Sequence, residues 1–315
     1  MDETWVLSDG RAGNARQAQA LAAALGRPAR EFVLQPRAPW AWAAPRRLPG
    51  AQHAFGPEFA QALTRPPALA IGCGRQAALA TRLLRAHGAA AVQILDPRLD
   101  PAHWDLVIAP EHDGLHGANT LSLLGSLHPV DDLWLAAGRS AYPAYAALPA
   151  PRIALLLGGA SAHAALDAPA LDALVAQVAA LAARVGGSVL ATASRRTPDA
   201  VRAHLRAQLA AVPGVAWSGE GDGANPYAGL LGWADCVVCT ADSVNMLSEA
   251  SATNAPLYVA GHERLQGRPR RFVDALIASG RMRAYAADGA LDAYAVMPLR
   301  ETARIAEQVR RRLGL

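Results

Sequence analysis

Apolar and polar positions along the first part of the chain follow two alternating patterns. Runs of about five apolar residues, typical of buried strands, occupy residues 4–8, 30–34, 68–73, 91–95 and 105–109. Between these runs, apolar residues recur at helical spacing, as in Ala18, Leu21 and Leu25 and again over residues 75–87. Strands that alternate with helices predict an α/β fold, in which helices cover both faces of a parallel sheet.

The same alternation resumes in the second half of the chain. We expect strands at residues 153–157, 188–193, 215–217, 236–239 and 256–260, and helices at 168–185, 225–233 and 299–313, with another helix ending near residue 209. Residues 125–151 contain four prolines and show no regular period, so we expect them to form an irregular linker between two domains.

The predicted organisation has an N-terminal α/β domain over residues 1–135 and a C-terminal α/β domain over residues 150–298. A C-terminal helix over residues 299–315 packs back toward the N-terminal domain. Two Rossmann-like domains of this kind would present the carboxyl ends of their strands across a shared cleft.

Composition narrows the classes of protein that the chain can represent. No stretch approaches the roughly 18 uncharged apolar residues of a membrane span, and the acidic start argues against a secretory signal. Three cysteines give no disulfide framework, which favours a reducing, cytoplasmic compartment. The net charge is +4, every basic side chain apart from histidine is an arginine, and no nucleic-acid recognition motif occurs. Guanidinium groups suit phosphate recognition.

The strongest candidate for a binding site is the segment 240–250, which reads TADSVNMLSEA and joins two apolar runs. A strand, a turn of small polar residues and a helix direct backbone N–H groups and a positive helix end toward one point, which suits a phosphate. We expect Asp242, Ser243, Asn245 and Met246 to lie at this point and Glu249 to bind a ribose. The alternative is that Asp242 or Ser243 only caps the helix, and the charge of Asp242 argues against a phosphate.

Two further segments of the second domain are candidates for binding a diphosphate. Ser194, Arg195 and Arg196 follow a predicted strand, where the arginines would clamp an anion or simply remain solvated. A glycine turn holds Gly158, Gly159 and, two positions on, Ser161. We expect the backbone of one of the glycine turns of this chain to approach the ligand closely.

The first domain opens with a comparable turn. It contains Asp9, Gly10, Arg11, Gly13 and Asn14. Its two glycines have the order Gly-x-x-Gly, which lacks the third glycine of the dinucleotide fingerprint, so a Rossmann NAD site is not expected. The turn is a candidate for the acceptor or partner side of the protein.

A histidine–carboxylate pair, His112 and Asp113, follows the predicted strand 105–109. Such a pair is a candidate general base for a sugar hydroxyl, and Asp9 is a second candidate. The alternative is that Asp113 only caps a turn.

Two other groups of residues have plainer interpretations. Cys236 and Cys239 lie three apart in a predicted strand and would point to opposite faces, so we expect burial and no metal site. Trp40, Trp42, Arg46 and Arg47 share the proline-rich excursion 35–50. They either pack on the sheet edge or rest on an anionic membrane surface, which would suit a lipid-linked acceptor.

Four motifs, which begin at Ser8, Pro110, Ser194 and Asp242, resemble in sequence and order the plant "elongated mitochondria" fission-factor family and its bacterial relatives. The resemblance implies a GT-B-like fold and, in plants, recruitment of a dynamin-related protein to mitochondria. Bacterial members are sometimes labelled nucleoside-diphosphate-sugar epimerases. A more distant likeness is to the lipid-linked N-acetylglucosaminyl transferase of peptidoglycan synthesis, but Asn14 stands where that enzyme has a histidine.

These observations lead to one principal functional hypothesis and two alternatives. The principal hypothesis is a sugar-nucleotide-binding, GT-B-like protein, a candidate metal-independent glycosyltransferase whose ligand is a UDP-sugar or another nucleotide sugar and which needs no cofactor. The alternatives are a non-catalytic adaptor on the same fold and a nucleoside-diphosphate-sugar epimerase. We expect the protein to be cytoplasmic, with a peripheral membrane location if the tryptophan-bearing excursion binds lipid.

Overall fold

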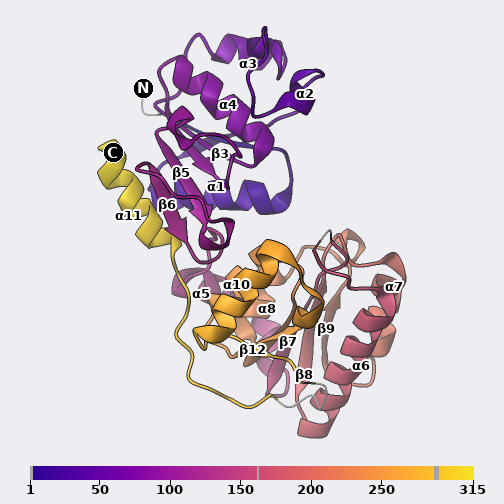
Figure 1. Cartoon of the computed structure of the whole chain (residues 1–315). Coiled ribbons are helices and arrows are strands. Elements are labelled where there is room, and N and C mark those ends of the chain that lie inside the picture. Colours follow the sequence, from indigo (N-terminus) through magenta and orange to yellow (C-terminus); the bar gives the residue numbers. More distant parts are fainter. Residues whose placement is uncertain (1–2, 162, 287–290) are drawn as a thin grey trace. The chain divides into compact units, whose positions relative to one another are not determined.

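The computed structural model describes residues 3–161, 163–286 and 291–315. The chain forms two compact units (Figure 1). Unit 1 extends to Pro129 and also includes Glu301–Leu315, whereas unit 2 comprises Val130–Arg300. Each unit is an α/β fold around one parallel sheet, as the alternation of strands and helices predicts.

Unit 1 contains a six-stranded sheet with the order β2-β1-β3-β4-β5-β6, and every pair in it is parallel. The strands are β1 (Thr4–Ser8), β2 (Ala29–Val33), β3 (Leu69–Cys73), β4 (Ala90–Ile94), β5 (Leu106–Pro110) and β6 (Thr120–Leu123). The helices are α1 (Ala12–Ala24), α2 (Trp40–Ala43), α3 (Pro57–Ala62), α4 (Arg75–Ala86) and α11 (Thr302–Leu313), with short 3-10 turns η1 (Ala51–His53), η2 (Pro101–His103) and η3 (Glu111–Asp113).

Helices cover both faces of the first sheet because alternate residues of each strand point to opposite sides. Val6 packs in a cluster with residues of α1 and α11, whereas Trp5 and Leu7 pack in another cluster with residues of α3 and α4. Ile305 and Val309 of α11 are fully buried in the first cluster. The expectation that the C-terminal helix returns to the N-terminal domain is therefore confirmed.

Unit 2 contains a second six-stranded parallel sheet, with the order β12-β11-β10-β7-β8-β9. Its strands are β7 (Arg152–Leu157), β8 (Ser188–Ala193), β9 (Gly214–Trp217), β10 (Cys236–Thr240), β11 (Leu257–Ala260) and β12 (Arg283–Ala284). Its helices are α5 (Asp132–Ala141), α6 (Ala168–Val185), α7 (Asp199–Gln208), α8 (Tyr227–Trp233), α9 (Val244–Ser251) and α10 (Gly267–Ala278), with 3-10 turns η4 (Pro143–Ala147), η5 (Glu220–Asp222) and η6 (His262–Arg264).

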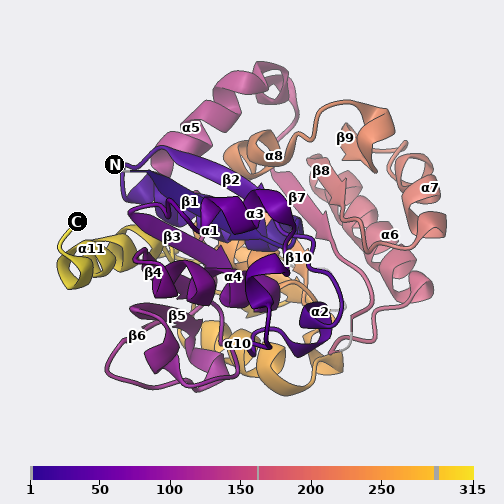
Figure 2. The same cartoon turned by 90° about the horizontal axis from the view of Figure 1, so that it is seen from above.

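Helix α6 is the one helix among the described residues that is long and apolar enough to cross a membrane by length and composition. One of its faces, which includes Leu171, Val175 and Val178, is buried in the core cluster of unit 2 together with residues of β7 and β8. Helices α6 and α7 lie side by side, next to strands β8 and β9 (Figure 1 and Figure 2). Packing against the sheet therefore accounts for the apolar composition of α6.

The segment 125–151 differs from its expected irregular form because it contains helix α5. The Asp131 carboxylate caps this helix by accepting a hydrogen bond of 2.7 Å from the Trp134 N–H. Gly138 lets α5 approach α8 closely, since a Cβ there would lie 2.3 Å from the carbonyl oxygen of Ala228. Helix α5 was not predicted from the sequence because prolines flank it and because it contains Gly138, which its contact with α8 requires.

Candidate functional site

Three of the predicted binding segments meet at one edge of the second sheet. Strands β10, β7 and β8 are neighbours in that order, and all three run parallel. The turns after their carboxyl ends therefore lie side by side, although they are far apart in the sequence. These turns hold Asp242 and Ser243, Gly158 and Gly159, and Ser194, Arg195 and Arg196.

The carboxylate of Asp242 joins the three turns. Its Oδ1 accepts a hydrogen bond of 2.7 Å from the Thr240 hydroxyl, which in turn accepts one of 2.7 Å from the Gly158 N–H. Its Oδ2 accepts a hydrogen bond of 3.2 Å from the Gly159 N–H and forms an ion pair of 2.6 Å with Nη2 of Arg196. The Asp242 side chain is 0% exposed, whereas that of Arg196 is 42% exposed.

Burial raises the pKa of Asp242, and the positive charge of Arg196 and the hydrogen bonds from Thr240 and Gly159 oppose that rise. A backbone N–H and a guanidinium group thus converge on an anion at the end of β7, as they would on a ligand phosphate. In this structure the anion is the carboxylate of the protein itself.

The glycines of the β7 turn accommodate neighbouring parts of the protein. A Cβ at Gly158 would lie 1.9 Å from Oδ1 of Asp242, and a Cβ at Gly159 would lie 2.0 Å from the carbonyl oxygen of Arg196. The close approach expected between a glycine turn and a ligand is thus made, at these two positions, to the chain's own β10 and β8 turns.

A buried threonine fixes the β8 turn against the β7 turn. The Thr197 hydroxyl donates toward the carbonyl oxygens of Leu157 and Gly158, at 3.0 and 2.6 Å, and accepts a hydrogen bond of 3.0 Å from the Ser194 N–H. Arg195 is exposed next to this network. Sequence reasoning passed over Thr197 and Thr240, whose only signal was a hydroxyl at or after the end of an apolar run.

Helix α9 begins at the same edge of the sheet. The Ser243 hydroxyl caps it by accepting a hydrogen bond from the Met246 N–H at 3.4 Å, as the capping alternative expects. Asn245 and Met246 are half-buried in the first turn. Glu249 is 2% exposed and lies on α9, the helix that packs against β10.

Ser161 lies farther along the chain, outside the network around Asp242. It forms an isolated antiparallel bridge with Ala164, and its hydroxyl accepts a hydrogen bond of 3.3 Å from the His163 N–H. Its hydroxyl therefore stabilises the turn in which it lies.

The first turn of unit 1 is held by a different set of contacts. Oδ1 of Asp9 accepts hydrogen bonds of 2.9 Å from Nδ2 of Asn14 and 3.2 Å from the Arg11 N–H. Gly10 adopts a left-handed conformation with φ of 76°, which suits glycine at this sharp turn, and Gly13 lies within the first turn of α1. These residues form one cluster at the carboxyl end of β1.

The other candidate base of unit 1 lies away from that cluster. His112 and Asp113 form the η3 turn at the carboxyl end of β5, and both are half-buried. Strand β5 is three positions from β1 in the sheet, so the two strands that precede Asp9 and His112 lie about 14 Å apart at a strand spacing of about 4.8 Å. The structure therefore does not bring the two candidate bases together.

The two tryptophans of the excursion 35–50 have different surroundings. Trp40 packs against a core cluster and donates its Nε1–H to the carbonyl oxygen of Pro49 at 3.0 Å. Trp42 is 78% exposed. The packing alternative therefore holds for Trp40, while Trp42 remains available for contact with a partner.

Cys236 and Cys239 are buried, free thiols, as is Cys73. Across the described part of the chain, no three histidine, cysteine or acidic side chains are grouped so that they could hold a metal ion.

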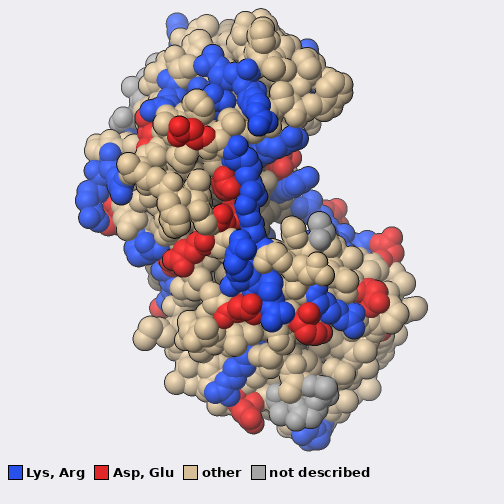
Figure 3. Space-filling model, viewed as in Figure 1, with Lys and Arg blue, Asp and Glu red and all other residues tan. Residues whose placement is uncertain are grey.

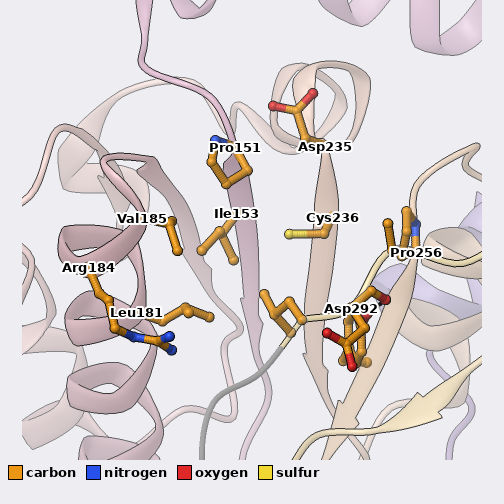
Figure 4. A pocket seen from close by; sticks show the side chains of 12 residues that line it. Pro151, Ile153, Leu181, Arg184, Val185, Asp235, Cys236, Pro256 and Asp292 are labelled. Atoms are coloured by element: carbon orange, nitrogen blue, oxygen red, sulfur yellow. Dashed lines mark hydrogen bonds between the residues drawn. The ribbon is translucent and has the colours of Figure 1, made fainter.

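A cavity of about 300 Å³ lies at the opposite edge of the second sheet, near the starts of β7, β10 and β11 (Figure 4). Ile153, Leu181 and Cys236 contribute to its lining, beside Arg184, Asp235 and Asp292. It contains none of the predicted site residues, which all lie at carboxyl ends of strands or in the segments that follow them.

Comparison with solved structures defines the class of fold. The chain is similar to a putative UDP-N-acetylglucosamine 2-epimerase from Listeria monocytogenes, with a TM-score of 0.59, 14% identity and coverage of 99% of this chain and 96% of that one. It is also similar to a UDP-glucosyltransferase from Polygonum tinctorium, with a TM-score of 0.52, 10% identity and coverage of 99% and 92%. Together with the two parallel sheets, these similarities show a GT-B-like fold.

The family follows from sequence. Residues 12–313 match the family model described as mitochondrial fission ELM1, and the chain belongs to this family. It is 30% identical over 277 residues to the mitochondrial fission protein ELM1 of Arabidopsis thaliana. That match covers 79% of this chain and 64% of the Arabidopsis protein, so the chain spans less than two thirds of the length of that relative.

Proposed function

We propose that unit 2 binds the diphosphate of a nucleotide sugar at the turns that follow β10, β7 and β8. The observation on which this rests is the anion-binding arrangement around Asp242, where the Gly159 N–H and the Arg196 guanidinium hold a carboxylate. The exposed Arg195 and the start of α9 lie at the same edge of the sheet. UDP-linked substrates in the names of the two structural neighbours support a uridine nucleotide as the ligand class.

In this proposal Arg196 exchanges partners when the ligand binds. Its side chain is partly exposed, so it can turn from the Asp242 carboxylate to a phosphate without losing a buried position. Asp242 therefore competes with the ligand for the guanidinium group. Glu249, which is buried on α9, is the proposed partner of the ribose hydroxyls.

Calorimetric titration with UDP tests this arrangement. Arg196→Gln should weaken binding about tenfold or more, since a charge-assisted hydrogen bond contributes about 1.5–3 kcal/mol and 1.4 kcal/mol is tenfold. Asp242→Asn should strengthen binding because it removes the competing charge while an oxygen remains to accept from Thr240. Arg184→Gln, an exposed arginine beside the cavity at the opposite edge of the sheet, is the matched control and should leave binding unchanged.

Equal affinities of wild type, Arg196→Gln and Asp242→Asn for UDP would place the nucleotide elsewhere. Where UDP does bind, incubation with UDP-N-acetylglucosamine and analysis of the products by NMR separates epimerisation, which yields an isomeric sugar, from transfer, which requires an acceptor. For transfer, Asp9 and His112 are the proposed candidate bases, since each follows the carboxyl end of a strand of unit 1.

The buried position of Asp242 also favours a second candidate function, a non-catalytic adaptor. A carboxylate that already occupies the place of a phosphate is what a protein would retain if its nucleotide site had lost its ligand. In that case the wild type would show no UDP binding. Detectable binding of UDP by the wild type would exclude this form of the adaptor.

A further inference from the structure

A second group of positive charges lies in unit 1, and none of its residues is a proposed nucleotide contact. Arg47, Arg82, Arg85 and His103 line an open pocket of about 320 Å³, together with Ala86 and Ala102. Helix α4 starts at the carboxyl end of β3 and runs back along the sheet, so its last two turns, with Arg82 and Arg85, lie toward the amino edge. The pocket is therefore at the opposite edge of the sheet from Asp9 and His112.

The walls of the pocket are fixed by hydrogen bonds. Nη1 of Arg82 donates to the carbonyl oxygen of Pro45 at 2.7 Å, which holds the excursion 35–50 against α4. Arg85 donates through Nε to Asp105 at 3.0 Å and through Nη1 to the carbonyl oxygen of Ala102 at 2.6 Å. The guanidinium carbon of Arg82 lies 5.8 Å from the ring centre of the buried Trp104. These contacts thus fix the guanidinium groups of Arg82 and Arg85 without a ligand.

The pocket carries more positive charge than its surroundings neutralise. Asp105 pairs with Arg85, but within the described ranges of the chain neither Arg47 nor Arg82 has a carboxylate partner. Burial and the nearby charge of Arg47 lower the pKa of Arg82. Burial, followed by the charge of Arg82, lowers the pKa of His103, an effect that Asp100 opposes and Arg85 reinforces. Like charges are therefore held together where an anion would stabilise them.

Basic side chains gather over the part of unit 1 where α4 runs (Figure 3). Arg47 projects from the excursion as an exposed side chain with no hydrogen bond or ion pair to any residue that the structure describes. Arg82 and Arg85 still have unused N–H groups, since Arg82 uses one nitrogen and Arg85 two. Guanidinium groups with free, planar N–H pairs bind phosphate bidentately.

We propose that this pocket binds a phosphate group, with Arg47, Arg82 and Arg85 as its charge partners and His103 as a further donor. A tetrahedral dianion offers enough acceptor oxygens for several arginines at once. This site is independent of the nucleotide site proposed for unit 2. The phosphate comes either from a soluble phosphorylated compound or from the headgroup of an anionic lipid, for which the exposed Trp42 of the same excursion provides an apolar contact.

The first experiment uses the full chain and inorganic phosphate, with the imidazole signals of His103 followed by NMR. In the wild type, phosphate should shift these signals in a saturable way and raise the pKa of His103, because the dianion offsets Arg82 and Arg85. Arg47→Gln should weaken phosphate binding about tenfold. Arg46→Gln is the matched control, since Arg46 is an exposed neighbour that does not line the pocket.

The proposal is overturned if phosphate leaves the His103 signals unchanged, or if Arg46→Gln and Arg47→Gln weaken binding equally, which would indicate only a diffuse charge effect. Because the readout is at His103, phosphate bound at the turns of unit 2 would not produce a false positive. Arg47→Gln should leave UDP binding unchanged. A loss of phosphate binding in this variant is therefore distinguishable from a failure of the nucleotide site.

The second experiment distinguishes the sources of the phosphate. Vesicles of phosphatidylcholine alone, and vesicles that also contain phosphatidic acid, are sedimented with wild type, Arg47→Gln and Trp42→Ala. Pelleting that requires phosphatidic acid and is lost in both variants assigns the pocket to a lipid headgroup. Phosphate binding at His103 without any pelleting assigns it to a soluble phosphorylated compound.

Discussion

In each unit the first strand, β1 or β7, is buried and leads into a glycine-bearing turn, but the two units fill the space beside that turn differently. In unit 1 the Asn14 amide lies next to Gly74, where a Cβ would come within 2.7 Å of its nitrogen, and donates to the partly exposed Asp9. In unit 2 the fully buried carboxylate of Asp242 lies next to Gly158. The first turn is local and reaches water, whereas the second connects three strands.

This difference predicts which turn tolerates change. A hydrogen bond that water can reach can be replaced by one to water, so its loss costs less than that of a fully buried one. A buried carboxylate with three or more partners leaves donors unsatisfied when it is removed, and it cannot move aside when a neighbour grows. The turn of unit 2 should therefore be the more sensitive of the two to substitution.

Gly158→Ala should have the largest effect on stability. Its Cβ would meet Oδ1 of Asp242 at 1.9 Å, and the hydrogen bonds to Asp242 oppose any shift of that carboxylate. We expect unfolding free energy to fall by about 3 kcal/mol in chemical denaturation, the upper part of the range for overpacking.

Gly221→Ala is the matched control for this substitution. A Cβ at Gly221 would have no heavy atom of the described residues within 4 Å, so the change in stability should be less than about 0.5 kcal/mol. The double variant Gly158→Ala/Asp242→Ala should lose less stability than the sum of the two single changes. Full additivity would contradict the packing account.

Removal of the two carboxylates should have unequal effects. Asp242→Ala leaves the buried Gly159 N–H without its acceptor and Arg196 without its ion-pair partner, and should cost about 2 kcal/mol, whereas Asp9→Ala should cost less than about 1 kcal/mol. Denaturation midpoints of the two variants provide the measurement. Equal losses of stability in the two variants would contradict the expectation that the turn of unit 2 is the more sensitive one.

The smallest expected difference concerns the thiols beside these carboxylates. Burial, more than the neighbouring charge of Asp9, raises the pKa of Cys73, and burial, more than Asp242 and Glu249, raises that of Cys239. Burial also raises the pKa of Cys236 to about 12. Thiolate is the reactive form, so a thiol reagent should label the native protein slowly at both pH 7 and pH 9.

The same labelling experiment in denaturant should give three fast-reacting thiols. Asp9→Asn and Asp242→Asn should increase native-state labelling only slightly, because burial is the dominant cause in both units. Fast labelling of either native variant, without loss of fold, would show that the carboxylates and not burial protect the thiols.

Much of the fold could be predicted from the period of the apolar residues. The strand Thr4–Ser8, the helix Ala168–Val185 and the strand Ser188–Ala193 were predicted with the bounds that the structure has, because their apolar residues face a core and their ends carry turn residues. Helix α5 was missed, since Gly138 and the surrounding prolines give no helical signal while contact with α8 stabilises the helix.

The candidate site, too, could be predicted only in part from the sequence. Sequence alone determined which residues follow each strand, and hence that Gly158, Arg196 and Asp242 occupy carboxyl ends in the second domain. Only the strand order β10-β7-β8 decided that these three positions meet, and that Asp9 and His112 do not. Period and turn chemistry are local properties of a chain, whereas strand neighbours and the burial of a charge depend on the packing of the whole sheet.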